Sequence, residues 1–463
     1  MKFAIETRNC AKANALGWAA LICASALLFA AATVGSAQEQ PAATSPAAAA
    51  PAATSNAQPA PDQKAAPAAA PAKTDSAPAE HIPGKEHLKL KEKQDKDEIT
   101  ATHNQGQWKV ENVDQSPGAD VGRFASLVID RAGNFHVAYY DKTNKALRYG
   151  FRPRNDKRWF IMAVEGKGSG TYVSMAVDSQ GHPHLAYNSP KEDGLHYAYF
   201  DGRSWKITML DTTRINYYTS IQLDKDGNPR ISYYLYHAPD GTYLLHLKYA
   251  EYDGKAWTIQ TLDRRPETGK FNSLAVDQAG LPSIAYTNVS TGDLLFAKYD
   301  GKDWKFSDAD SRRFHNSYVG IGNSIAVDAA GNAHIAYFDG TRNTVKYAHW
   351  TGEHWETQVV DQLVSRGEAD RVSLKIDKDG HPHIAYYDAG TGSLKYAAKT
   401  DKLWNVQTVD NEGNVGMYPS LSFDPAGVPY IAYYAVDSGS LRLAHLVGPA
   451  PAPAVAEKQQ QQK

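Results

Sequence analysis

The chain is poor in cysteine, with only Cys10 and Cys23 among its 463 residues. Both lie in the N-terminal segment that we predict to be removed on export, so the mature protein would contain none. Disulfide bonds therefore cannot stabilise the fold, and a metal site built on thiolates is excluded.

Neither positive nor negative charge is in clear excess. Lys and Arg total 49 and Asp and Glu total 51, which leaves a formal net charge of -2. Proteins that bind the phosphate backbone carry clustered basic residues, so we expect no nucleic-acid partner. The chain also lacks Gly-x-Ser-x-Gly, His-Glu-x-x-His and a phosphate-binding glycine loop. We accordingly expect no cofactor and no metal.

The first 37 residues have the pattern of a Sec-type signal peptide. Basic residues precede an apolar run from Ala15 to Val34, and the small residues Gly35, Ser36 and Ala37 offer a cleavage site. This predicts a secreted or periplasmic protein with no membrane span after cleavage. A retained anchor is the alternative, because the run is nearly long enough to cross a bilayer.

Composition divides the remainder into three parts. Residues 38–105 are rich in Ala and Pro and then in charge, which predicts a disordered linker. Residues 448–463 have the same Pro/Ala character, followed by a Gln run, and predict a disordered tail. The folded part is expected over residues 106–447.

A Trp followed by five residues and an acid occurs seven times. The copies run from Trp108, Trp159, Trp205, Trp257, Trp304, Trp355 and Trp404 to Asp114, Glu165, Asp211, Asp263, Asp310, Asp361 and Asp410. The first copy precedes the first full repeat, and the last repeat ends at Leu446 without a Trp strand of its own. A closed ring explains this offset, because the N-terminal strand can complete the final repeat. The pattern predicts an all-β, seven-bladed β-propeller of four-stranded antiparallel blades, closed by an N-terminal outer strand in the last blade.

Each repeat is expected to hold four strands, A to D. Strand A ends in Ser-φ-x-φ-Asp, where φ is apolar, and its acids from Asp130 to Asp424 are spaced by 49 residues on average. Strand B begins with His in four repeats, at His136, His184, His334 and His383. Such a repeated position does not converge around a ring, so we interpret these histidines as structural rather than metal ligands. The tyrosines that recur in strand B are interpreted as core.

The long D–A and B–C connections should lie together on one face, where propellers usually bind ligands. The candidate ligand-binding residues just before strand A are Arg123, Tyr172, Tyr217, Tyr218, Phe271, Tyr318, Arg371 and Tyr418. At the end of strand B they are Asp141, Asn188, Asn288, Asp339 and Asp388. Aromatic rings stack on sugars, and carboxylates, amides and guanidinium groups bond to hydroxyls. A carboxylate pair for glycoside hydrolysis could come from Asp141, Asp339, Asp370 or Asp388, and no catalytic residue is assigned.

The repeat resembles the Asp-box (BNR) hairpins of sialidase-like propellers in its Asp-x-x-Gly turn followed by an Ile-Ala-Tyr strand. It is also similar to NHL-type repeats at Ala326-Val327-Asp328-Ala329-Ala330-Gly331. The Asp-Gly-x-x-Trp hairpins at Asp253 to Trp257 and Asp300 to Trp304 are similar to those of fucose-binding propeller lectins. Two features depart from sialidases: the aromatic residue three positions after the Asp-box Gly is absent from most repeats, and there are seven units rather than six.

Three functions follow as hypotheses. The first is an exported, monomeric propeller that binds a glycan or a cell-envelope protein on its loop-rich face. The second is an enzyme, a sialidase-like glycoside hydrolase or a polysaccharide lyase with its site at the end of the central channel. The third is a structural adaptor of an envelope complex.

Overall fold

The computed structural model describes residues 101–105, 107–166, 168–189, 194–212, 216–237, 243–311, 318–365, 371–400 and 403–448. At residues 101–105, 216, 237, 243 and 244 only the backbone is described. The predicted signal peptide, nearly all of the predicted linker and all but one residue of the predicted tail lie outside these ranges. No helix of the described part is long and apolar enough to cross a membrane.

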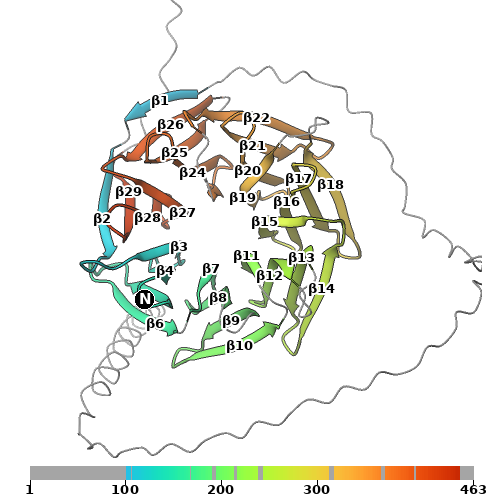
Figure 1. Cartoon of the computed structure of the whole chain (residues 1–463), viewed down its shortest axis with the longest axis horizontal. Coiled ribbons are helices and arrows are strands. Elements are labelled where there is room, and N and C mark those ends of the chain that lie inside the picture. The colour runs from blue at the N-terminus through green and yellow to red at the C-terminus, as the bar shows by residue number, and fades with distance from the viewer. Residues whose placement is uncertain are drawn as a thin grey trace, which may run out of the picture. The chain divides into compact units, whose positions relative to one another are not determined.

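Seven sheets of antiparallel strands surround a central axis, which confirms the predicted propeller (Figure 1). Blade 1 comprises β3 (Val121–Ile129), β4 (Phe135–Asp141), β5 (Ala146–Arg152) and β6 (Phe160–Glu165). Blade 2 comprises β7 (Thr171–Val177), β8 (Pro183–Ser189), β9 (Gly194–Phe200) and β10 (Trp205–Asp211). Blade 3 comprises β11 (Asn216–Leu223), β12 (Pro229–His237), β13 (Tyr243–Tyr252) and β14 (Trp257–Asp263). Blade 4 comprises β15 (Thr268–Val276), β16 (Pro282–Asn288), β17 (Asp293–Tyr299) and β18 (Trp304–Asp310).

The last three blades continue the ring. Blade 5 comprises β19 (Val319–Val327), β20 (Ala333–Asp339), β21 (Thr344–Trp350) and β22 (Trp355–Gln362). Blade 6 comprises β23 (Val372–Ile376), β24 (Pro382–Asp388), β25 (Ser393–Thr400) and β26 (Leu403–Asp410). Blade 7 comprises β27 (Val415–Phe423), β28 (Pro429–Ala435), β29 (Ser440–Leu446) and, as its outer strand, β2 (Trp108–Asp114).

Strand β2 closes the ring as the displaced Trp motif predicted. It pairs antiparallel with β29, in a register that begins at Trp108 opposite Leu446 and ends at Asp114 opposite Leu441. Just beyond the paired strands, the amide of Val447 donates to the carbonyl of Gln107 at 2.7 Å. The two ends of the folded chain therefore meet in one blade.

One strand was not predicted. Strand β1 (Ala101–Gln105), at the end of the segment assigned to the linker, pairs in parallel with the outer strand β26 of blade 6. An outer strand has unpaired amide and carbonyl groups that accept a further strand. The polar sequence of residues 101–105 gives no alternation by which this strand could have been recognised.

A hydrogen bond to a serine hydroxyl joins the inner strand of each blade to that of the next. The hydroxyl oxygen of Ser373 in blade 6 accepts a hydrogen bond of 2.9 Å from the amide of Leu421 in blade 7. All seven blades repeat this contact, at donor–acceptor distances of 2.8 to 3.2 Å. The last of them joins Ser420 to the amide of Leu127 in blade 1, so the bonds form a closed cycle.

The acid of each Trp motif links neighbouring blades farther from the axis. In six cases it accepts a hydrogen bond of 2.5 to 2.9 Å from the strand-B tyrosine of the next blade. In the seventh, Asp114 of β2 accepts one from Tyr139 of blade 1. These tyrosines are fully buried, which confirms their assignment to the core.

Most of these acids also contact a cation on strand C of the receiving blade. Lys346 lies 2.6 Å from Asp310, and Arg442 lies 3.0 Å from Asp410. Blade 4 has Leu295 at this position, and there Arg265 binds Asp263 at 2.6 Å instead. Each buried carboxylate thus keeps a partner for its charge, as burial requires.

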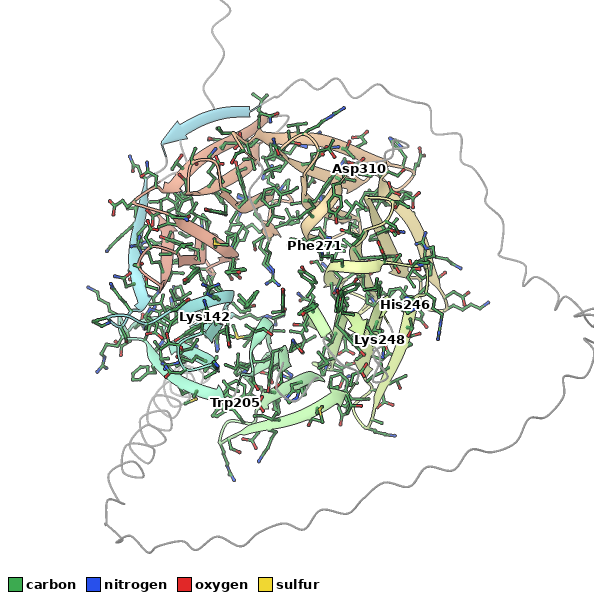
Figure 2. The ribbon with its side chains drawn as sticks, in the orientation of Figure 1. Lys142, Trp205, His246, Lys248, Phe271 and Asp310 are labelled. Carbon is green, nitrogen blue, oxygen red and sulfur yellow. The ribbon has the colours of Figure 1, made fainter. Side chains whose placement is uncertain are left out.

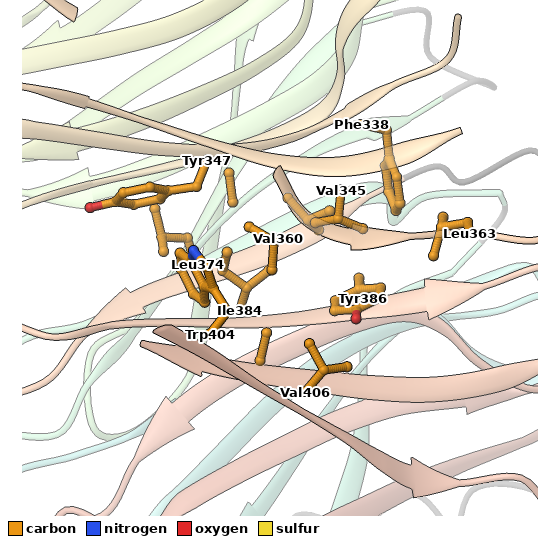
Figure 3. Close-up of a cluster of buried hydrophobic side chains, with 13 residues drawn as sticks. Phe338, Val345, Tyr347, Val360, Leu363, Leu374, Ile384, Tyr386, Trp404 and Val406 are labelled. Atoms are coloured by element: carbon orange, nitrogen blue, oxygen red, sulfur yellow. The ribbon is translucent and has the colours of Figure 1, made fainter. Parts of the chain in front are cut away.

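The apolar cores lie between adjacent blades. In the core between blades 5 and 6, the ring of Trp404 stands edge-on to Tyr347 at a centroid distance of 5.3 Å (Figure 3). Five other tryptophans of the motif meet strand C of the preceding blade in the same way, at 5.0 to 5.4 Å: Trp108, Trp205, Trp257, Trp304 and Trp355. The motif is therefore an interblade contact at both of its ends.

Candidate functional site

The loop-rich end of the central axis carries an arc of aromatic side chains. They occupy the position two residues before the strand-A serine: Phe124, Tyr172, Tyr218, Phe271 and Tyr418. Neighbouring rings are in contact, with centroid distances of 4.6 Å for Tyr418–Phe124, 4.5 Å for Phe124–Tyr172, and 4.8 Å for both Tyr172–Tyr218 and Tyr218–Phe271. Figure 2 shows Phe271 near the axis and Trp205 near the outer rim. We call these five residues the aromatic arc.

All five residues of the aromatic arc have a left-handed backbone, with φ values of 57°, 55°, 55°, 55° and 52° in chain order. The register of strand A shifts just there, as between Arg123 and Ser126 in blade 1. Such a bulge suits glycine, and Gly322 of blade 5 occupies the same position with a φ of 57°. Bulky residues at positive φ are strained, so the backbone conformation does not explain why these five positions are aromatic.

Two blades interrupt the arc. Blade 5 contributes Gly322, which has no side chain, and blade 6 contributes Arg371. Since these blades are adjacent, the aromatic rings cover five consecutive blades and leave one side of the axis without them.

Further tyrosines extend the aromatic surface over blade 3. Tyr217 lies beside Tyr172 and Tyr236, at centroid distances of 5.1 and 5.9 Å. Tyr234, nearly buried below them, lies 6.4 Å from Tyr218. Tyr172, Tyr217, Tyr218 and Tyr236 are half-buried, so part of each ring faces solvent.

Arg123 lies beside the aromatic arc rather than in it. Its guanidinium group binds both oxygens of Asp120 at 2.9 Å and stands over the ring of Tyr434. Burial raises the pKa of the Asp120 carboxyl, but hydrogen bonds from Arg123 and Tyr434 outweigh it and hold that pKa below its usual value. Arg123 and Asp120 form a charged, partly exposed pair at the same end of the axis.

The predicted residues at the end of strand B are buried. Asp141, Asp339 and Asp388 have no exposed surface, and Asn188 and Asn288 are 1% and 7% exposed. Their oxygens hold the B–C turns: Asp141 accepts the amide of Asn144 at 2.9 Å, and Asp388 accepts that of Gly390 at 3.0 Å. Two of the acids also bind strand-C cations, Arg148 at 2.6 Å and Lys395 at 2.8 Å. Asp370 lies outside the described residues.

Two further differences concern the candidates before strand A. Tyr318 lies six residues ahead of Ser324, outside the arc, and its amide donates to the hydroxyl of Thr341 at 2.8 Å. Phe124, in contrast, belongs to the arc and was not among the candidates. Alignment of the repeats on the strand-A serine would have identified it, since it lies two residues before Ser126 as Tyr172 lies before Ser174.

The strand-B histidines connect two other residues of their own blade. One ring nitrogen of His136 lies 2.7 Å from the hydroxyl of Tyr149, and the other lies 3.3 Å from Asp130 of the A–B turn. His184, His334 and His383 contact a strand-C tyrosine likewise. Within the described ranges no three His, Cys, Asp or Glu side chains are grouped so as to hold a metal ion.

No protein-family model and no curated protein matches the chain by sequence. Solved structures of similar arrangement include a fucose-specific lectin from Aleuria aurantia, at 14% identity and a TM-score of 0.44, covering 64% of this chain and 98% of the lectin. An ulvan lyase, described as a polysaccharide lyase, has 14% identity and a TM-score of 0.49 over 73% of this chain and 96% of its own. A protein of unknown function from Dyadobacter fermentans has 12% identity and a TM-score of 0.45 over 74% and 100%. At such identities the likeness concerns the fold alone.

Proposed function

We propose that this protein is an exported binding propeller that holds a saccharide against the aromatic arc. The arc is the observation that carries the proposal. Five consecutive blades place a strained aromatic residue where a sixth shows that glycine suffices, and each ring contacts the next. Phe124, Tyr172 and Tyr218 are half-buried and face solvent in part, whereas Phe271 and Tyr418 are 8% and 7% exposed and support them. Aromatic faces are the usual platforms for the apolar faces of sugar rings.

The polar groups around the arc suit the same ligand. Arg123 and Asp120 lie together at the edge of the arc, and Arg371 takes the position of a sixth ring. Such groups donate to and accept from sugar hydroxyls, and they give orientation to a ligand that stacking alone would leave free to rotate. The predicted signal peptide supports export.

Hydrolysis of a glycosidic bond is not supported by Asp141, Asp339 or Asp388, which are buried. The fourth predicted acid, Asp370, lies outside the described residues. Asp141 and Asp388 are buried and paired with Arg148 and Lys395, so they cannot reach a substrate. A general acid and a nucleophile must both touch the scissile bond. We therefore propose saccharide binding as the function of this site and assign it no hydrolytic residue.

A glycan array and calorimetry test the proposal. Tyr218→Gly and Tyr172→Gly copy the residue of blade 5, so the backbone of the bulge should tolerate them. Each should weaken saccharide binding at least tenfold. Phe306→Ala is the control, because Phe306 is 46% exposed on the outer strand β18, far from the axis.

Two outcomes would contradict the proposal. Saccharide binding that survives both glycine variants would separate the ligand from the arc. An array with no positive glycan, together with specific capture of an envelope protein that Tyr218→Gly abolishes, would show a protein to be the ligand instead.

A further inference from the structure

The B–C hairpin of blade 3 is longer than those of the other blades. Strand β12 has 9 residues and β13 has 10, whereas the strand that corresponds to β12 has 7 residues in every other blade. Leu235 occupies the position at which Asp141 and Asp388 hold short turns, and a leucine side chain cannot accept those amides. The strands of blade 3 continue past this point, which lengthens the hairpin at the loop-rich end by roughly 7 Å.

A bulge lies in the added part of this hairpin. The two strands pair at Leu235 and again at His237, and between these positions Tyr236 stands opposite two residues of β13. One of those two residues, Leu245, has a left-handed backbone with a φ of 54°. A bulge changes the direction of the side chain beside it, and a leucine at positive φ is strained. The hairpin therefore carries the same kind of backbone strain as the aromatic arc.

Ring contacts connect Tyr236 to the aromatic arc. Its ring centroid lies 5.9 Å from that of Tyr217, which in turn lies 5.1 Å from that of Tyr172 in the arc. Tyr234 lies 6.3 Å from Tyr236 and is 3% exposed, so it supports the other rings from below. Tyr172, Tyr217 and Tyr236 are half-buried, and part of each ring is accessible. The aromatic surface thus leaves the axis at Tyr172 and continues onto the hairpin of blade 3.

The three accessible rings do not form one flat platform. The planes of Tyr172 and Tyr217 meet at 64°, and those of Tyr217 and Tyr236 meet at 60°. Each ring therefore presents a face of its own. Since a sugar ring is similar in size to an aromatic ring, one sugar stacks on one such face. A single sugar would leave most of this surface uncovered, whereas a chain that turns from one sugar to the next could cover it.

We propose that the saccharide is a chain of three or more sugars that is bound along its length, from Tyr172 at the axis to Tyr236 on the hairpin of blade 3. This inference rests on the proposed function and adds the size of the ligand. Tyr172 then belongs to the core of the site, and Tyr217 and Tyr236 determine the preference for longer chains.

Calorimetry with saccharides of graded length tests the inference. The probes are the glycans that bind on the array together with their shorter fragments, and homo-oligomers of glucose, galactose and N-acetylglucosamine supply series of one to six sugars. In each series that binds, the dissociation constant should fall at least tenfold from the disaccharide to the tetrasaccharide, because the longer chain covers further rings.

Variants of blade 3 locate the added contacts. Tyr236→Ala should bind the tetrasaccharide no more tightly than the disaccharide. Tyr217→Thr should have the same effect, and it copies Thr171, the residue before the arc in blade 2. Tyr236→Phe retains the ring and should retain the gain with length. Phe306→Ala is the control, since Phe306 is an exposed aromatic residue of the outer strand β18.

The outcomes separate this inference from the function on which it rests. Equal binding of a monosaccharide and its tetrasaccharide, lost in Tyr172→Gly, would overturn the chain and keep the saccharide site. A gain with length that persists in both Tyr236→Ala and Tyr217→Thr would overturn the path over blade 3. If no length series and no glycan of the array binds, both proposals fail.

Discussion

Asp114 accepts a hydrogen bond from Tyr139, although the two residues belong to different blades and Asp114 lies on the strand that closes the ring. Strand β2 therefore supplies blade 7 with an outer strand and blade 1 with a partner for a buried hydroxyl. Deletion of residues 102–114 should lower the midpoint of thermal unfolding and broaden the transition, because both supports are lost. Calorimetry would show this.

Deletion of residues 38–100 is the matched control and should leave the unfolding transition unchanged. An unaltered transition in the 102–114 deletion would contradict the role of β2 in stability.

The contact between Lys346 and Asp310 gives a second prediction. Lys346 is 2% exposed and lies 2.6 Å from the carboxylate, which also accepts the hydroxyl of Tyr337. Asp310→Asn removes the negative charge and should lower the free energy of unfolding by about 3 kcal/mol. Asp300→Asn, at an exposed turn, should change it by less than about 0.5 kcal/mol. Similar effects of the two variants in urea unfolding would show that the buried contact adds nothing.

The serine cycle predicts a smaller, repeated effect. Ser373→Ala removes the acceptor of the Leu421 amide and should destabilise the protein by about 1 kcal/mol. Ser126→Ala should do the same through Met175. Ser204→Ala, in an exposed turn, serves as the reference. Urea unfolding measures all three, and losses no greater than that of the reference would mean that the bonds only position the blades.

Acid should destabilise the ring through its histidines. Burial lowers the pKa values of His334 and His383, and the neighbouring aspartates only partly oppose this. An unfolded histidine titrates near pH 6.5, so below that pH the unfolded chain binds more protons than the native protein does. The free energy of unfolding should therefore fall as the pH is lowered from 8 through about 6.5 to 5.

The variant carrying both His334→Gln and His383→Gln should show a shallower decline over the same pH range. Equal slopes for the variant and the natural chain would assign the acid sensitivity to other groups.

The architecture could be predicted because every repeat has the same strand and turn pattern. The early position of Trp108 to Asp114 also makes sense only if this strand completes the last blade and closes the ring. The partners of the repeated residues could not: the spacing from Trp to acid does not reveal that Asp263 binds Tyr286 of the next blade. A bulge hid Phe124, since an extra residue breaks the alternation by which faces of a strand are assigned. Burial separated the acids from the arc, and sequence carries no measure of how deep Asp141 lies.

The hydrogen bond between Gln107 and Val447 has a consequence for the order of the blades in the sequence. A short peptide could join these two positions, and the chain could then be cut at any A–B turn without breaking a strand. Such circular permutants would start in different blades, yet β2 would still pair with β29 in blade 7. Whichever blade is synthesised first, the molecule has no intrinsic first or last unit.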